Sequence, residues 1–360
     1  MIKKWSMVIS FVILAVMILL SACAPAQPAP TPAPTPTPAP APSPITLKFS
    51  TWMPAAKGHP DYEKAERMFA EITKRTNGQV KFNMFPSEQL AAQKDQIDGI
   101  KTGLFDVCTY MSSTTPAKSP LWTINWQPWA LTDSVTVILQ AMRDMSKDPA
   151  YQKELDQWGA MYLSCCGGGP RIAMSKKPLN SLDDFKGLKV RASGREAEAY
   201  KIFGATPIAV PTAEIYDAIA KGTLDATTQP YINLVSYGIH EVTKYVYDIN
   251  LGMGSPIFIM SKDAFNKLPA NIQKVITDVV AEDDIVHGQK IDKQIKDEMA
   301  KGKQAGKQTF VSCTPAEQKK YDDVVADKIM GDWIKEMNDK GLPGQAAFDA
   351  FKKAQEKYKK

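Results

Sequence analysis

Residues 45–110 read ITLKFSTWMPAAKGHPDYEKAERMFAEITKRTNGQVKFNMFPSEQLAAQKDQIDGIKTGLFDVCTY, and this stretch decides the expected fold. Three runs in which apolar and polar residues alternate predict strands, at 45–51, 79–85 and 104–110. The alternation places one set of side chains on each face of a sheet.

Two helices are expected between these strands. Tyr62, Ala65, Phe69 and Ile72 share one face of a helix from about Pro60 to Thr76, which the following Asn-Gly stops. A second helix is expected from about Glu88 to Lys101. The order β-α-β-α-β predicts an α/β fold with a mostly parallel sheet covered by helices.

The second half of the chain repeats this pattern. A helix ends at Phe203, a strand follows at 206–210, and Thr212 is the expected N-cap of a helix through Lys221 that leads into the segment 223–230. The sequences IKTGLFDV (100–107) and IAKGTLDA (219–226) both end a helix at glycine and enter a strand. We therefore expect two similar α/β lobes.

One helix is expected to be much longer than the others. From Pro269 to about Lys303 there is no internal proline, and apolar residues recur every three or four positions. A continuous helix of this length measures about 50 Å at 1.5 Å per residue, which exceeds one lobe. It should therefore lie across both lobes, as the strut of a clamp.

The N-terminus resembles a bacterial lipoprotein signal. Lys3 and Lys4 precede an uncharged apolar run that ends in LLSAC, so the resemblance implies cleavage and a lipidated Cys23. An uncleaved membrane anchor and an ordinary signal peptide remain alternatives. Residues 24–44 alternate proline with small uncharged residues, which favours an extended polyproline II spacer of roughly 60 Å.

Composition excludes several kinds of function. Without Lys3 and Lys4 the formal charge of +5 falls to +3, which does not suggest a nucleic-acid partner. No cysteine spacing suggests zinc, and no cofactor motif is present. The sequence favours small buried side chains over disulfides for Cys108, Cys165, Cys166 and Cys313. The three histidines are far apart, so no catalytic or metal cluster is expected, and each is interpreted as a surface residue: His59, His240 and His287.

Two arginines lie in neighbouring strand-like runs just after a triple glycine. Arg171 and Arg191 are either solvated surface charges or converge on an anionic ligand. A guanidinium matches a carboxylate with two parallel hydrogen bonds and stays charged, which makes arginine well suited to the second role. The glycines at 167–169 lack a phosphate-binding motif, and we interpret them as thinning the backbone beside the first arginine.

A longer pattern around these arginines resembles a known family. The sequence FKGLKVRASG (185–194) and the segment from Ile202 to Pro230 are similar to the signature region of the DctP-type substrate-binding proteins of TRAP transporters, the tripartite ATP-independent periplasmic importers. The resemblance extends over essentially the whole body of the chain. It implies a receptor, not an enzyme, that delivers a small organic acid to the small and large membrane subunits of the importer.

The resemblance also implies site residues. Arg171 holds the ligand carboxylate and Arg191 assists it. The family carries an asparagine before the proline where this chain has Gln229, a departure that puts the role of this position in doubt. The other implied contacts are Trp52, Tyr110, Met111 and Thr212, and core packing is an equal alternative for Trp52 and Tyr110. Trp122, Trp126 and Trp129 are interpreted as packing under a loop.

The implied architecture is an α/β, two-lobed clamp like that of periplasmic binding proteins. Each lobe is a sheet flanked by helices, and the long helix spans both. The expected segments are a lipoprotein signal peptide (1–22), a linker (23–44), lobe I (45–168 and about 255–268), lobe II (169–254), the spanning helix (269–305) and a C-terminal helical segment (306–360).

Three other functions remain open at this point. A similar clamp could serve an ABC importer or a sensor kinase. A secreted α/β hydrolase would need a nucleophile motif such as GxSxG, which the sequence lacks. A purely structural surface lipoprotein would have no ligand cleft.

Overall fold

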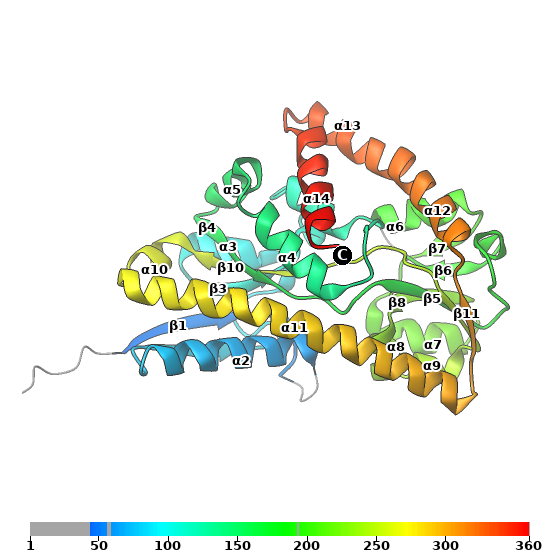
Figure 1. Ribbon diagram of the computed structural model, residues 1–360, viewed down its shortest axis with the longest axis horizontal. Helices are drawn as coiled ribbons and strands as arrows, with labels where there is room; N and C mark the ends of the chain where they lie inside the picture. Colours follow the sequence, from blue (N-terminus) through cyan, green and yellow to red (C-terminus); the bar gives the residue numbers. More distant parts are fainter. Residues whose placement is uncertain (1–43, 56–58, 193, 360) are drawn as a thin grey trace, which may run out of the picture. The chain divides into compact units, whose positions relative to one another are not determined.

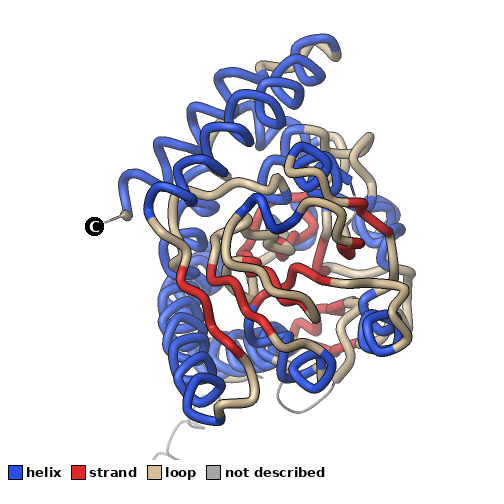
Figure 2. Tube along the Cα trace, turned by 90° about the vertical axis from the view of Figure 1, so that its right-hand side faces the viewer, coloured by secondary structure: helices blue, strands red, loops and turns tan. Residues whose placement is uncertain are grey.

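The computed structural model of the chain describes residues 44–55, 59–192 and 194–359 (Figure 1). The expected signal peptide, the lipidated Cys23 and all of the linker but its last residue lie outside the described residues. The described part forms one body that contains two β-sheets with helices packed around them, and Figure 2 shows the strands enclosed by the helices. None of the described helices is long and apolar enough to cross a lipid bilayer.

The first sheet has five strands in the order β2-β1-β3-β10-β4. Their bounds are β1 Ile45–Ser50, β2 Val80–Phe85, β3 Val107–Tyr110, β4 Ala160–Cys165 and β10 Ile257–Ser261. β1 is parallel to β2 and β3, as the βαβ pattern predicts, but β10 is antiparallel to both β3 and β4. The sheet is therefore mixed rather than mostly parallel, because a strand from much later in the chain is inserted between β3 and β4.

The second sheet has six strands in the order β11-β9-β5-β8-β6-β7. Their bounds are β5 Arg171–Ser175, β6 Lys189–Arg191, β7 Thr206–Ile208, β8 Ala226–Pro230, β9 Tyr245–Asp248 and β11 Thr309–Ser312. β5 is antiparallel to β8 and β9, whereas β6 is parallel to β7 and β8. The amino end of β5 and the carboxyl ends of β6 and β8 consequently meet at one edge of this sheet.

Helices surround both sheets. The α-helices are α2 Pro60–Arg75, α3 Gln96–Thr102, α4 Val135–Met145, α5 Pro149–Asp156, α6 Gly194–Ile202, α7 Ile215–Ala220, α8 Tyr231–Ser236, α9 Ile239–Val242, α10 Lys262–Asn266, α11 Ala270–Ala305, α12 Pro315–Val324, α13 Gly331–Asp339 and α14 Gly344–Tyr358. Short 3-10 segments lie at 93–95, 112–114, 121–126, 182–185 and 212–214, and a π-helical turn joins α12 to α13.

Several expected element bounds are corrected. The helix expected from Glu88 is a 3-10 turn at Gln93–Asp95 followed by α3 at Gln96, and Ser87 and Glu88 adopt left-handed backbone angles that an α-helix cannot include. The helix expected to start at Thr212 is a 3-10 turn followed by α7 at Ile215, and Thr212 makes no N-cap hydrogen bond. The C-terminal segment is not purely helical, since β11 adds a strand to the edge of the second sheet.

The expected long helix is confirmed. α11 is a single helix of 36 residues, about 54 Å long, that packs against α2, α4 and β4 at one end and against α8 at the other (Figure 1). It therefore spans both lobes. Asp292, near its middle, also caps the start of α4 by accepting hydrogen bonds from the Val135 N–H at 2.6 Å and the Ser134 hydroxyl at 2.8 Å.

Buried charges attach α11 to the first lobe. Lys64 of α2 is completely buried, and its Nζ lies 2.8 Å from Asp284 and 3.2 Å from Asp283 of α11. Asp284 also accepts hydrogen bonds from the Arg143 side chain and from the Ser164 hydroxyl, the latter at 2.6 Å. Burial alone would lower the pKa of Lys64, but the two aspartates raise it above its usual value, so the lysine stays charged.

The interpretation of His287 as a surface residue is wrong. Its side chain is completely buried on α11, beside the charged cluster just described. Its Nε2 lies 3.5 Å from Asp61 Oδ1 of α2. His59 and His240 are only partly exposed.

The expectation for the cysteines is confirmed for three of the four. Cys108, Cys165 and Cys166 are buried and unpaired, and Cys313 is an unpaired, half-buried cysteine. The described residues hold no group of histidine, cysteine and acidic side chains that could bind a metal ion.

Two extended segments, which lie side by side, connect the first sheet to the second. One runs from β4 to β5 through Gly167–Gly169, and the other runs from β9 to β10. They hydrogen-bond to each other, from the Cys166 N–H to Pro256 O at 3.0 Å and from the Arg171 N–H to Gly252 O at 2.9 Å. A Cβ on Gly169 would lie 2.3 Å from the Ile295 side chain, which agrees with the interpretation of the triple glycine as thinned backbone.

Candidate functional site

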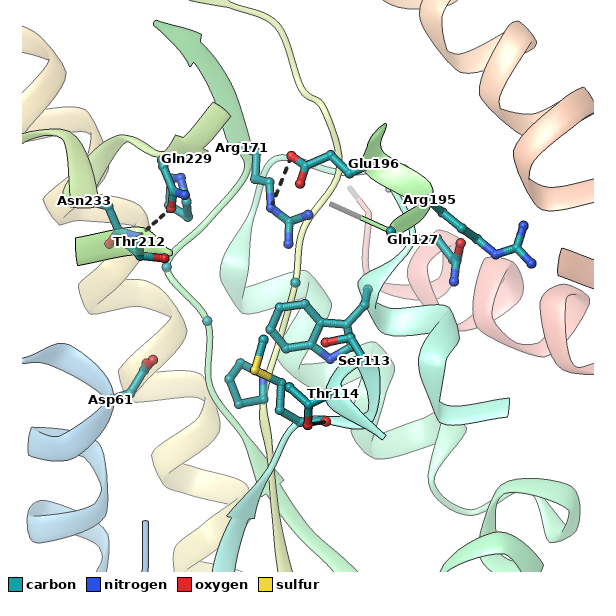
Figure 3. Close-up of a pocket in the computed structure, with 18 of the residues that line it drawn as sticks. Asp61, Ser113, Thr114, Gln127, Arg171, Arg195, Glu196, Thr212, Gln229 and Asn233 are labelled. Carbon is teal, nitrogen blue, oxygen red and sulfur yellow. Dashed lines mark hydrogen bonds and ion pairs between the residues drawn. The ribbon is translucent and has the colours of Figure 1, made fainter. Parts of the chain in front are cut away.

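A large cavity lies beside these crossing segments. Its volume is about 1090 Å³, and side chains from both halves of the chain line it (Figure 3). Met111 and the start of α2 contribute from the first lobe, while Arg171, Arg191 and Gln229 contribute from the second. The three latter residues come together because β5, β6 and β8 meet at one edge of the second sheet. The cavity is thus placed where the ligand of a two-lobed clamp is expected.

Arg171 is the first residue of β5 and pairs with Pro230, next to Gln229. Its side chain is 14 % exposed, and its Nη1 is buried without a hydrogen-bond partner. Leaving a buried charged donor unpaired is costly, so the guanidinium is ready to receive an anion. Arginine at this position can offer a carboxylate two parallel hydrogen bonds.

A neighbouring ring and a glycine fix the position of this guanidinium. The Arg171 Cζ lies 5.9 Å from the centre of the Trp126 ring, within the range of a cation–π contact. A Cβ on Gly254 would lie 2.5 Å from Arg171 Nη2 and 2.5 Å from the Trp126 ring. Only glycine therefore leaves room for both side chains as they stand.

Arg191 lies at the end of β6 and lines the same cavity. Its Nε donates to Val210 O at 3.1 Å, which orients the guanidinium. Burial lowers the pKa of Arg191, and the positive charge of Arg171 lowers it further, whereas Glu196 acts in the opposite direction. The two arginine charges are thus close enough to repel each other, and an anion between them would relieve that repulsion.

Glu196 provides only partial compensation for these charges. Its Oε1 lies 3.9 Å from Arg171 Nε, which is too long for a hydrogen bond. The same oxygen accepts hydrogen bonds from Thr228 at 2.7 Å and from Tyr200 at 3.2 Å. Glu196 is held by these neighbours and leaves Arg171 Nη1 without a hydrogen-bond partner.

Three more of the expected contact residues lie at the cavity. Gln229 is buried and accepts a hydrogen bond from Asn233 Nδ2 at 3.2 Å (Figure 3). Thr212 begins the 3-10 turn beside Arg191, and the Met111 sulfur accepts a hydrogen bond from Gln93 at 3.0 Å. Together with the arginines they form a polar surface with an apolar edge.

Trp52 and Tyr110 have different positions. Trp52 lines a smaller cavity of about 420 Å³, which adjoins the large one and shares Arg191, Met111 and Trp126 with it. Tyr110 is almost completely buried, and its hydroxyl is hydrogen-bonded to Ser119 at 2.7 Å and to Thr115 at 3.0 Å. The structure places Tyr110 in the core, and the expectation that it contacts ligand is corrected.

Sequence reasoning missed several cavity residues. Trp126 was interpreted as packing, which holds for the buried Trp122 and Trp129, but Trp126 lines the cavity beside Arg171. Asp61 enters the cavity from the first turn of α2, where an acidic residue usually serves the helix dipole. No sequence signal separates Asp61 from such a capping residue.

Arg195 is a third arginine at the cavity, but its charge is already paired with acidic side chains. It forms an ion pair with Glu336 of α13 and lies 3.6 Å from Glu198. In Figure 3 its side chain points away from Arg171. The positive charge that is only partly compensated therefore lies at Arg171 and Arg191.

Comparisons with known proteins agree with this arrangement. The family model described as "Bacterial extracellular solute-binding protein, family 7" matches residues 52–333. A TRAP periplasmic solute-binding protein from Desulfovibrio salexigens has a similar structure, with a TM-score of 0.79 and 25 % identity, over 88 % of this chain and 97 % of that one.

Two curated proteins are also similar in sequence. The C4-dicarboxylate-binding periplasmic protein DctP of Rhodobacter capsulatus is 26 % identical over 78 % of this chain and 84 % of its own length. The 2,3-diketo-L-gulonate-binding periplasmic protein YiaO of Escherichia coli is 28 % identical over 57 % of this chain and 63 % of its own length.

Proposed function

Because the chain belongs to family 7 of the bacterial extracellular solute-binding proteins, we propose that it captures a small organic acid outside the cytoplasm and delivers it to a TRAP-type membrane permease. The protein is a receptor of a solute-binding family, not an enzyme. Its relatives include proteins named for binding C4-dicarboxylates and 2,3-diketo-L-gulonate, both of which are organic acids.

The observation that carries this proposal is the buried, unpaired Nη1 of Arg171 at the cavity. Arg191 lies close enough for its pKa to be lowered by Arg171. A ligand carboxylate would pair with Arg171 and separate the two positive charges. We assign Arg171 and Arg191 as the carboxylate-binding residues, with Gln229, Thr212 and Met111 as further contacts and Trp52 as a contact at the adjoining cavity.

Ligand contacts on both lobes would also favour closure of the clamp. A ligand shifts a conformational equilibrium only by its differential affinity for the two states. The paired segments that cross between the sheets give a short connection about which the lobes can move. A ligand bound to Arg171 is thereby held next to the hinge itself.

The proposed function is tested by a thermal-shift screen of organic acids, each paired with its neutral primary amide. A ligand at 100 times its Kd stabilises a protein by about 2.7 kcal/mol, so binding acids should raise the unfolding temperature clearly. The matching amides should not, because they offer no charge to the arginines. An amide or a neutral sugar that stabilises the protein as well as any acid would contradict the carboxylate function.

We further propose that Cys23 carries a lipid anchor, so that the body is tethered to a membrane through the proline-rich segment before residue 45. Cys23→Ala should release the protein into the soluble extracytoplasmic fraction or stall its processing. Normal processing with unchanged membrane association would contradict the anchor.

A further inference from the structure

Two arginines and an aspartate face the cavity from opposite sides. Arg171 and Arg191 lie on the side of the second sheet, and Asp61 enters from α2, away from Arg171 in Figure 3. Asp61 lines both the large cavity and the smaller one that adjoins it. A ligand held by the arginines and extending across the cavity therefore approaches a carboxylate at its other end.

One carboxylate oxygen of Asp61 is buried in the protein, and the rest of its side chain is partly accessible to solvent. Its Oδ1 is buried and lies 3.5 Å from His287 Nε2, a distance and geometry that do not make a hydrogen bond. The side chain as a whole is 17 % exposed, so the accessible part belongs to the remainder of the group, which lines the cavity. Asp61 thus lies against His287 of α11 with one oxygen and lines the cavity with the rest of its side chain.

The carboxyl of Asp61 is ionised at neutral pH. Burial acts to raise its pKa, but the contact with His287 and the proximity of His59 outweigh burial and hold the pKa below its usual range. An ionised carboxylate only accepts hydrogen bonds. It therefore attracts hydroxyl and amino groups and repels another carboxylate.

The position of Asp61 also decides what the start of α2 can bind. A helix N-terminus carries partial positive charge and would otherwise attract a ligand carboxylate. Asp61 already places a carboxylate at the cavity in the first turn of this 16-residue helix, whereas Glu63 in the same turn is paired with Lys290 Nζ at 2.8 Å. The end of the cavity opposite the arginines is consequently unfavourable for an anionic group.

We propose that Asp61 determines specificity, so that the ligand is a monocarboxylic acid with a hydroxyl or amino group at the end distant from its carboxylate, and dicarboxylates are rejected. This rests on the proposed function, because Arg171 and Arg191 must first fix the carboxylate. It would distinguish the chain from its relative that is named for C4-dicarboxylates. A hydrogen bond to a charged acceptor contributes about 10- to 150-fold in affinity, and this is the preference expected for the hydroxyl or amino compound.

The test uses two matched series of compounds with the same skeleton. One contains 4-hydroxyphenylacetate, phenylacetate and 4-carboxyphenylacetate, and the other contains 6-aminohexanoate, hexanoate and adipate. Calorimetry gives the Kd of each compound for the parent protein and for Asp61→Asn, which keeps the shape of the side chain and removes its charge. In at least one series the parent should bind the hydroxyl or amino compound most tightly and the dicarboxylate most weakly.

In that series Asp61→Asn should weaken the hydroxyl or amino compound about 10-fold or more, leave the unsubstituted acid within about 3-fold, and improve the dicarboxylate. A parent protein that binds a dicarboxylate more tightly than the hydroxyl or amino compound overturns the inference, and this result needs no variant. Equal weakening of all three compounds by Asp61→Asn also overturns it, because that pattern indicates a structural role alone. Either result leaves carboxylate binding, and with it the proposed function, intact. If no acid in these series or in the wider screen binds, both the specificity inference and the proposed function are overturned.

Discussion

Asp284→Asn should destabilise the protein strongly, because it removes one buried carboxylate that serves two cations. Asp284 Oδ1 lies 2.8 Å from Nζ of the completely buried Lys64, and its Oδ2 accepts from Arg143 Nε at 3.1 Å. Asparagine has the same shape but no charge, so Lys64 retains only Asp283 at 3.2 Å. Removing one partner of a buried ion pair typically costs about 3–5 kcal/mol, because the other charge is left uncompensated.

Glu282→Gln provides the matched control. Glu282 also lies on α11 and pairs with Arg75 of α2, at 2.6 Å, but its side chain is 57 % exposed. An exposed pair contributes little to stability, because water and salt screen the two charges. Urea unfolding of both variants and the parent at pH 7 measures the difference. If Asp284→Asn lowers the free energy of unfolding no more than Glu282→Gln does, the buried cluster does not attach the long helix to the first lobe.

Two further predictions concern a buried acid and the glycine beside Arg171. Burial raises the pKa of Glu154 to about 7 from an ordinary value of 4.5, so the folded state binds more protons than the unfolded state between these pH values. The free energy of unfolding should therefore fall by up to about 3 kcal/mol as the pH rises from about 4.5 to 7. Glu154→Gln should remove this pH dependence in urea titrations. An unchanged slope in the variant would assign the pH dependence to other groups. Gly254→Ala should weaken ligand binding about 10-fold or more, because its Cβ would lie 2.5 Å from both Arg171 Nη2 and the Trp126 ring, whereas Gly331→Ala, with open space around the new Cβ, should bind as the parent does. Equal Kd values for the two alanine variants would show that the guanidinium is not held in place by this packing.

The elements that were predicted correctly are those whose pattern is local and long. The spanning helix follows from an apolar repeat with no internal proline between Pro269 and about Lys303, and the structure shows one helix at Ala270–Ala305. The sheets were harder to predict, because β10 and β11 join their sheets far from their neighbours in sequence. Short alternating runs indicate strands but do not say which strands pair or in which direction.

Individual residues show the same limit. Tyr110 ends a strand, as a ligand contact would, but its hydroxyl finds Ser119 in a later loop, which the alternation of the strand does not reveal. His287 lies in a highly polar stretch of α11 that is typical of a solvated face. It is buried because this side of α11 packs against the first lobe, where Lys64 of α2 and Arg143 of α4 pair with the nearby aspartates Asp283 and Asp284.

The sequence identified two of the arginines that lie at the cavity, but not how their neighbours are arranged. Strand alternation and the family resemblance singled out Arg171 and Arg191, and the structure brings both to the same cavity. What the sequence did not indicate is that Arg195 lies at this cavity too and is neutralised by Glu336 from the C-terminal helices. Arg195 therefore provides a matched control for substitution of Arg171.

The most direct test of the carboxylate site is calorimetric titration of Arg171→Lys and Arg195→Lys with the acid that binds the parent most tightly. Lysine keeps the charge but loses the two-pronged geometry, so Arg171→Lys should bind at least about 30-fold more weakly, corresponding to about 2 kcal/mol. Arg195→Lys should stay within about 3-fold of the parent, because Arg195 is committed to its ion pair with Glu336. If Arg171→Lys binds the acid as tightly as the parent does, Arg171 does not hold the carboxylate and the proposed mechanism of recognition is wrong.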